Sequence, residues 1–308
     1  MQRIHFIAIG SPVLHSIAIA SSKKNNFTIS GSDIEISEPA FSRLKLFGLL
    51  PEKLGWFPEK IVKGISAVII GKNVRFDNPE VLKAKELGLK IFTYPEFMYV
   101  QTRSKTRIVV GGSFGKTTIT AMIVFVLKHL RIDADYMLSA HIEGFDDKVK
   151  LSYDSRIAVF EGDENLISPI DCRPKFHIYK PHIAVLSCID SNSKNYFSTE
   201  EEYVALFQKF TDLMEVQGRL IYYEGDENLN EIASKLRRDI VPFAYKTPEN
   251  EIVNGVTLLK TKKGNIPLQV SGIHNLQNIE AARIACRQIG VTDDQFYSVI
   301  AKFTGISI

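Results

Sequence analysis

One stretch constrains this chain more than any other: a strand, a short glycine loop and a helix follow one another between residues 106 and 130. Residues 106–110 form a short β-branched run, which predicts a buried strand. Apolar residues recur at helical spacing from Ile119 to Leu130, which predicts a helix. The loop between them, Gly-Ser-Phe-Gly-Lys-Thr-Thr, occupies residues 112–118. A glycine loop in this context predicts a site for nucleotide phosphate.

The residue types in this loop suit a polyphosphate. Glycines let the backbone turn tightly and point several N–H groups at one anion, and the helix N-terminus adds a partial positive charge. Lys116 brings a full positive charge, and the Thr117 hydroxyl can reach a magnesium ion. The alternative is a glycine-rich turn with an incidental lysine. The candidate ATP-binding residues of the loop are Gly112, Ser113, Gly115, Lys116, Thr117 and Thr118.

Acidic residues follow a second predicted strand. Residues 157–160 are apolar, and Glu161, Asp163 and Glu164 come directly after them. Acidic residues at a strand end commonly face a metal–phosphate complex. Glu161 is therefore the candidate magnesium ligand beside Thr117, whereas Asp163 and Glu164 are expected to orient their neighbours or to face water. A solvated acidic turn is the alternative for the whole cluster.

Two asparagines at the start of a later predicted helix, Asn275 and Asn278, are candidates for contact with an adenine edge. A side-chain amide offers both a donor and an acceptor, which is what such an edge requires. The alternative is that Asn275 caps the helix and His274 is a surface residue.

The N-terminus has the order of a Rossmann-like unit. A strand at residues 4–9, a turn at 10–12 and a helix at 13–20 precede a second strand that ends in Gly31-Ser32-Asp33. An acidic residue about twenty positions after the first loop is typical of nucleotide-binding folds of this kind. Ala8 stands where a glycine is expected, so a plain βαβ turn remains the alternative.

Length and composition indicate two ordinary globular domains. A chain of 308 residues is long for one core, and the polar residues 101–106 suggest a linker. We therefore expect a Rossmann-like domain at residues 1–103 and a phosphate-loop domain with a mainly parallel sheet at residues 104–308. Strands are predicted at 157–160, 183–187, 219–223 and 241–245, alternating with helices at 200–214 and 228–236.

The overall charge and the cysteines exclude several other classes. The formal net charge of +3 gives no argument for nucleic acid, and no window is long and apolar enough to cross a bilayer. The three cysteines have no close pairing, which fits a reducing compartment. The sequence therefore predicts a cytoplasmic protein without a nucleic-acid or membrane partner.

Taken together, these motifs resemble the Mur ligases, the cytoplasmic enzymes that join amino acids or peptides to UDP-N-acetylmuramate in peptidoglycan synthesis. The compact loop at residues 112–118, the acidic motif at 161–164 and the segment at 272–278 are similar to the family's ATP-binding motifs. Residues 4–10, 31–33, 71–73 and 78–80 are similar to its UDP-sugar-binding domain. Residues 168–171 and 173–176 look closest to the murein peptide ligase branch, a near relative of the L-alanine-adding ligase.

The resemblance implies ATP and Mg²⁺ as cofactors, with a UDP-N-acetylmuramate-type substrate and an amino acid or peptide as partners. In that family the substrate carboxylate attacks the γ-phosphate, and the incoming amine displaces the resulting acyl phosphate. Lys116 and Glu161 would then be catalytic, with Thr117 and Glu161 on the metal. His274, Asn275 and Asn278 would bind ATP; Gly10, Ser11, Ser32 and Asp33 would bind the UDP-sugar.

Three departures from the family leave two hypotheses open. Asn192-Ser193 stands where the family has Asp-His, whose histidine helps to hold magnesium, and serine is a poor substitute. Phe114 replaces a histidine common in this branch, and we expect it to be a packing anchor. The family's third domain has no counterpart before residue 308. In the first hypothesis the chain is a ligase, either as a fragment of one or completed by a separate chain that supplies this domain. In the second it is a non-catalytic relative that binds nucleotide or UDP-sugar. A folylpolyglutamate-type ligase is a third option that the first domain argues against.

Overall fold

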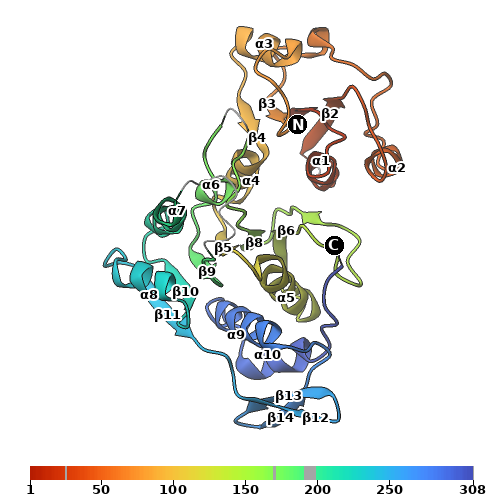
Figure 1. The fold of residues 1–308 in the computed structure, drawn as a ribbon. Helices are drawn as coiled ribbons and strands as arrows, with labels where there is room; N and C mark the ends of the chain where they lie inside the picture. The colour runs from red at the N-terminus through yellow and green to blue at the C-terminus, as the bar shows by residue number, and fades with distance from the viewer. Residues whose placement is uncertain (25, 169–170, 191–198, 308) are drawn as a thin grey trace. The chain divides into compact units, whose positions relative to one another are not determined.

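The computed structural model describes residues 1–24, 26–168, 171–190 and 199–307, and its elements are shown in Figure 1. The chain divides into two compact units. The first comprises Met1–Gln101, Val149–Tyr153 and Leu166–Arg173; the second comprises Thr102–Lys148, Asp154–Asn165 and Pro174–Ile308. The two later segments of the first unit were not predicted, since the expected boundary was a single linker at residues 101–106.

The first unit is an α/β structure built on a parallel sheet with the strand order β2-β1-β3-β4. The strands of this sheet are β1 (Gln2–Ile7), β2 (Phe27–Ser32), β3 (Ala67–Ile70) and β4 (Ile91–Thr93). The two-residue strand β7 (Val149–Lys150) belongs to the first unit but is not part of this sheet. Its helical elements are α1 (Leu14–Ser22), α2 (Ala40–Leu46), the 3₁₀ helix η1 (Pro58–Lys60), α3 (Pro79–Glu86) and α4 (Tyr94–Thr102). Helices α2 and α4 were not predicted.

The register of this sheet brings several loops to one edge. Ile7 pairs with both Ser32 and Ile70 across the parallel ladders, so β1, β2 and β3 end side by side. Ligands of open α/β sheets bind at the carboxyl ends of the strands. The loop that follows β1 and the residues that follow β2 are therefore placed where such a ligand would bind.

The second unit contains a larger parallel sheet, in which its strands follow the order β11-β10-β9-β5-β8-β6. These strands are β5 (Thr106–Gly111), β6 (Ala134–Met137), β8 (Ile157–Glu161), β9 (Ile183–Leu186), β10 (Arg219–Tyr223) and β11 (Val241–Tyr245). Helices α5 (Lys116–His129), α6 (Lys175–Ile178), α7 (Glu200–Asp212), α8 (Glu227–Ser234), α9 (Ile273–Arg287) and α10 (Asp293–Ile300) accompany them. The mainly parallel sheet expected from the sequence is confirmed.

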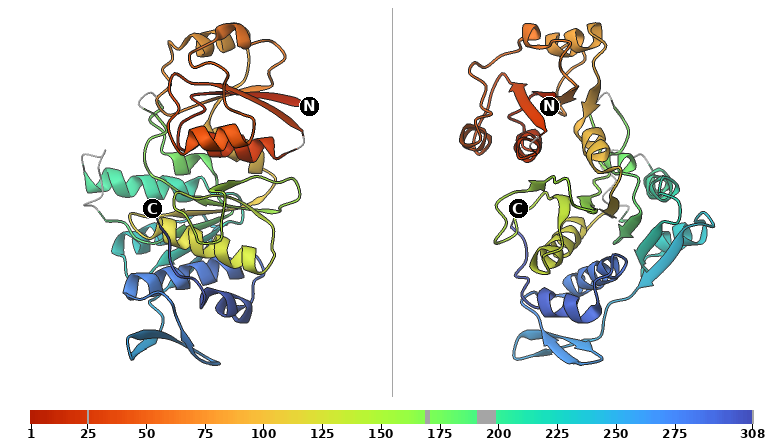
Figure 2. Two further views of the ribbon diagram at one scale, coloured as in Figure 1. Left: turned by 90° about the vertical axis from the view of Figure 1, so that its right-hand side faces the viewer. Right: turned by 180° about the vertical axis from the view of Figure 1, so that it is seen from behind.

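Helix α5 packs against α9 and α10, and the three helices lie on the same side of the sheet in Figure 2. Their apolar faces form one core with β5, β8 and β10, in which Val110, Ile119, Ile221 and Ile279 are fully buried. Since β5 runs between β8 and β9, its carboxyl end lies in the middle of the sheet. The phosphate loop is thus supported by neighbouring strands on both sides.

A small antiparallel sheet of β12 (Asn250–Val253), β13 (Val256–Thr261) and β14 (Gly264–Pro267) was missed by the sequence analysis. Asn254 and Gly255 form its first turn with φ of 50° and 80°. An Asn-Gly pair with positive φ at both positions is the commonest signal for a two-residue hairpin. The sequence therefore contained the signal, and the short flanking strands were overlooked.

Candidate functional site

Two glycines of the loop after β5 occupy positions that other residues cannot easily take. Gly112 has φ of 126°, and a Cβ there would lie 2.2 Å from Ser187 Oγ. Gly115 has φ of 80°, and its Cβ would lie 2.6 Å from Asn278 Oδ1. Positive φ and close approach both select glycine. The loop can therefore pass close to the end of β9 and the start of α9 only because these positions lack a side chain.

Hydrogen bonds from the end of β9 hold the loop in place. The Ser113 amide donates to the Cys188 carbonyl at 2.8 Å, and Ser113 Oγ accepts from the Asp190 amide at 2.8 Å. The Ser187 hydroxyl donates to the Phe114 carbonyl. Ser187, Cys188 and Asp190 follow β9 and were not predicted as neighbours of the loop. They are more than 70 residues away in the sequence and come close only because β9 pairs with β5.

Phe114 itself is 60% exposed. The expectation that it anchors the loop by packing is wrong, since its main chain makes the contact and its ring lies at the surface.

Lys116 opens α5 and folds back over the loop. Its Nζ donates to the Gly112 carbonyl at 2.6 Å and lies 3.0 Å from Glu164 Oε2. The first amide groups of any helix have no intrahelical partner, so an ammonium group and free amides share this end of α5. That combination attracts an anion.

Thr117 and Glu161, the two predicted magnesium ligands, are in contact. The Thr117 hydroxyl donates to Glu161 Oε1 at 2.8 Å, and the other carboxylate oxygen, Oε2, is buried with no hydrogen-bond partner among the described residues. A buried carboxylate oxygen without a partner is costly unless a ligand completes it. One hydroxyl and one carboxylate fit Mg²⁺, which takes few protein ligands and completes its shell with phosphate oxygens and water. Within the described ranges, no three His, Cys, Asp or Glu side chains form a metal-binding group.

The other two acidic residues of this segment, which were expected to orient their neighbours or to face water, are both paired with lysines. Asp163 pairs with Lys175 and accepts a hydrogen bond from the Asn165 amide at 2.9 Å. Burial alone would raise the pKa of Asp163, but Lys175 and Asn165 outweigh it and lower that pKa. Glu164 turns the other way, toward Lys116. The alternative of a solvated acidic turn is therefore wrong for both residues.

Among the three residues proposed for adenine, the structure places Asn278 against the loop, beside Gly115. Asn278 is buried, whereas His274 is exposed. The helix cap is Gly272, not Asn275, and the side-chain Nδ2 of Asn275 donates to the Ser271 carbonyl at 2.8 Å. Contact of His274 and Asn275 with ATP stays a prediction.

In the first unit, the loop after β1 is fastened to the end of β2. The Gly10 amide donates to Asp33 Oδ2 at 2.8 Å, and the Leu14 amide donates to Ser11 Oγ at 3.3 Å. A Cβ on Gly10 would lie 2.8 Å from Ile36 Cγ1. Gly10 and Asp33 are therefore in contact, while the binding of a UDP-sugar by Gly10, Ser11, Ser32 and Asp33 stays a prediction.

Ser32 belongs to a buried polar network that the sequence did not reveal. Its hydroxyl donates to Glu80, and the Glu80 carboxylate also accepts from the Phe57 amide at 2.7 Å and lies 3.4 Å from His5 Nε2. His5, Ser32 and Glu80 are all fully buried. Burial would raise the pKa of Glu80, but these hydrogen bonds lower it on balance. The Ser32 carbonyl accepts from the Ala8 and Ile9 amides, so this network holds the end of β2 against the start of the loop.

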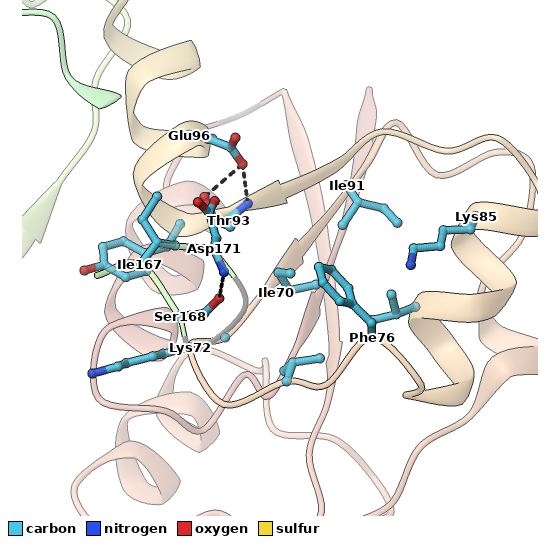
Figure 3. Close-up of a pocket in the computed structure, with 14 residues that line it drawn as sticks. Ile70, Lys72, Phe76, Lys85, Ile91, Thr93, Glu96, Ile167, Ser168 and Asp171 are labelled. Atoms are coloured by element: carbon cyan, nitrogen blue, oxygen red, sulfur yellow. Dashed lines mark hydrogen bonds between the residues drawn. The ribbon is translucent and has the colours of Figure 1, made fainter. Parts of the chain in front are cut away.

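A pocket of about 240 Å³ lies within the first unit, at the carboxyl ends of β3 and β4. Figure 3 shows its apolar wall, which includes Ile70, Phe76 and Ile91. Its two acidic side chains already have partners. Glu96 accepts a hydrogen bond from Thr93 Oγ1 at 2.8 Å, and both Glu96 and Asp171 pair with Arg173. The pocket is mainly apolar, and none of the predicted site residues lines it.

The chain is therefore an α/β protein of two units: a smaller Rossmann-like unit, and a larger unit whose parallel sheet carries the glycine loop at the end of β5. Comparison with known proteins carries the assignment further. The model of the Mur ligase middle domain matches residues 110–286. The chain belongs to the Mur ligase family, in the branch of the L-alanine-adding and murein peptide ligases.

Relatives and solved structures agree with this placement. The UDP-N-acetylmuramate–L-alanine ligases of Carboxydothermus hydrogenoformans and Desulforamulus reducens are 26% and 27% identical over 99% of this chain. This chain spans 66% of the length of each.

Among solved structures, the UDP-N-acetylmuramate:L-alanyl-gamma-D-glutamyl-meso-diaminopimelate ligase from Neisseria meningitides has a TM-score of 0.84 at 20% identity, with 98% of both chains covered. A murein peptide ligase from Psychrobacter arcticus has a TM-score of 0.83 at 21% identity, covering 99% of this chain and 69% of the other. No helix in the described part of the chain is long and apolar enough to span a membrane.

Proposed function

We propose that this chain binds ATP with Mg²⁺ on its phosphate loop and a UDP-N-acetylmuramate-type substrate on its N-terminal unit. It would do so as an ATP-dependent ligase that joins an amino acid or peptide to the muramate carboxylate in the cytoplasm. In this proposal, the domain of residues 1–103 binds the UDP-sugar and the domain of residues 104–308 binds ATP. The names of the relatives support the substrate class, and the loop geometry supports the nucleotide.

The observation that carries the proposal is the contact between Thr117 and Glu161 beside the loop. Among the residues that the structure describes, the second, buried carboxylate oxygen of Glu161 has no hydrogen-bond partner, close to the lysine and the helix end that suit a phosphate. These two residues would hold Mg²⁺, which neutralises phosphate charge when it is bound. Lys116 would neutralise the terminal phosphate, and the loop amides would orient it. The substrate carboxylate could then attack the γ-phosphorus of ATP, which forms the acyl phosphate and releases ADP.

In the first unit, the same kind of argument applies to the loop after β1. Asp33 fixes the Gly10 amide at 2.8 Å, and Ser32 and Glu80 hold β2 beneath it. This gives a rigid backbone turn at the carboxyl ends of the strands, where a nucleotide diphosphate would sit in such a sheet. Gly10 and Ser11 are the residues expected to contact the UDP-sugar directly.

A second candidate function is nucleotide or UDP-sugar binding without ligation. It is favoured by Phe114, whose exposed ring cannot donate the hydrogen bond of the histidine common in this branch. The substitution of the family's metal-binding histidine by Ser193 points the same way, although residues 192 and 193 lie outside the described residues.

Activity and binding assays separate the two functions. We would measure ADP release with UDP-N-acetylmuramate and either L-alanine or the tripeptide across a range of magnesium concentrations. Turnover supports the ligase; ATP binding without turnover supports the second function.

Calorimetry with an ATP analogue then tests the loop directly. Lys116→Ala should abolish binding, whereas Lys262→Ala, an exposed lysine of the same unit, should leave it unchanged. Equal affinity in both variants would refute the assignment of the loop.

A further inference from the structure

The carboxylate of Glu164 has a position that the proposed function does not use. Its Oε2 lies 3.0 Å and its Oε1 3.4 Å from Lys116 Nζ. The Lys116 and Glu164 side chains are only 14% and 13% exposed. Lys116 Nζ donates a long hydrogen bond to Glu164 Oε1, whereas Oε2 has no hydrogen-bond partner in the described part of the chain and makes an ion pair with Lys116.

The surroundings of Glu164 fix it in that position. The Tyr203 hydroxyl lies 3.0 Å from Ser113 Oγ on the loop and also interacts with Glu164. Burial, together with the negative charge of Glu164, raises the pKa of Tyr203 to about 12. Tyr203 therefore stays protonated at neutral pH and can donate a hydrogen bond to one of these neighbours. Glu164 thus lies between a buried tyrosine and the lysine of the loop.

We propose that Glu164 is a specificity-determining residue of the nucleotide site, because its carboxylate takes the place beside Lys116 that a phosphate group needs. This inference rests on the proposed function of the loop. An incoming polyphosphate must displace Glu164 from Lys116 and then remain close to its negative charge. Glu164 therefore lowers affinity for free polyphosphates and favours the magnesium complex.

The physical reason is the sign and the separation of the charges. Two like charges a few ångströms apart in a partly buried site repel strongly, because little water screens them. A divalent cation held by Thr117 and Glu161 offsets that repulsion. Glu164 therefore lowers the binding affinity most for ATP without magnesium, and less for MgATP.

The test compares ATP binding by calorimetry in excess Mg²⁺ and in EDTA. Glu164→Gln keeps the size of the side chain and removes the charge. In EDTA it should raise ATP affinity by about tenfold or more, which is the order of one charge-assisted hydrogen bond. In Mg²⁺ the gain should be smaller. Glu164→Asp, which keeps the charge, should gain less than Glu164→Gln in EDTA.

A matched control removes one charge elsewhere in the same unit. Glu231 pairs with Lys235 on the exposed face of α8, and Glu231→Gln should leave ATP affinity unchanged in both buffers. An unchanged or weaker affinity of Glu164→Gln in EDTA would overturn the inference. So would an equal gain in Glu231→Gln, because a general charge effect would then suffice. If the wild-type protein and every variant fail to bind ATP in either buffer, the proposed function itself fails.

Discussion

Replacing Gly115 by alanine is expected to damage both the stability of the second unit and its nucleotide site. Gly115 has φ of 80°, and an added Cβ would lie 2.6 Å from Asn278 Oδ1. Gly144 offers a matched control in the same unit, since its φ is 79° and nothing lies within 4 Å of its Cβ position. Both substitutions strain the backbone, but only Gly115→Ala brings the new Cβ into collision with a neighbouring side chain.

The magnitudes follow from these two terms. A left-handed alanine costs about 1 to 2 kcal/mol at either position. At Gly115 the collision adds roughly 1 to 3 kcal/mol of overpacking, because the buried Asn278 amide or the loop must move. Gly115→Ala should therefore lower the free energy of unfolding by about 2 to 5 kcal/mol, against about 1 to 2 kcal/mol for Gly144→Ala.

Urea unfolding followed by circular dichroism measures the difference, and calorimetry with an ATP analogue gives a second result. We expect Gly115→Ala to lose ATP affinity and Gly144→Ala to keep it. If Gly144→Ala is at least as destabilising as Gly115→Ala, and both bind ATP like the wild type, the close packing of the loop against α9 does not hold in solution.

Further predictions concern buried charges and one exposed ring. The pKa of Glu80 is lowered by folding, so ionised Glu80 stabilises the folded protein. This stabilisation is present above the unfolded pKa near 4.5 and is lost as the pH falls through the folded value. Glu80→Gln should accordingly cost about 1 to 3 kcal/mol at pH 7, and a gap that fails to shrink in acid unfolding experiments would contradict this. Lys175→Met removes the cationic partner of Asp163 and should lower the melting temperature at pH 7. The melting temperature should recover toward pH 3, where Asp163 becomes protonated. An equal loss of melting temperature at both pH values would speak against the ion pair. Phe114→Ala should change the free energy of unfolding by less than about 0.5 kcal/mol because the ring is exposed, and a loss above 2 kcal/mol in urea unfolding would show that it packs after all.

Local patterns in the sequence were sufficient for the fold class and for the elements that form the loop. The β-branched run of β5 and the apolar spacing of α5 predicted a strand and a helix around residues 112–118, and the structure has them at Thr106–Gly111 and Lys116–His129. Thr117 and Glu161 were both predicted as magnesium ligands, and the structure brings them into contact because β5 and β8 are neighbouring parallel strands. Helices α2 and α4 were missed because neither their spacing nor their flanking residues stand out.

What the sequence by itself determined is therefore the order of most strands and helices along the chain, together with the glycines, Lys116, Thr117 and Glu161 of the proposed nucleotide site. Only the tertiary structure decided which distant side chains complete these loops. Ser187 holds the Phe114 carbonyl, Glu164 turns to Lys116 and Glu80 supports Ser32. These contacts depend on strand order and on which face of each element is buried, and such long-range geometry leaves no periodic signal along the chain.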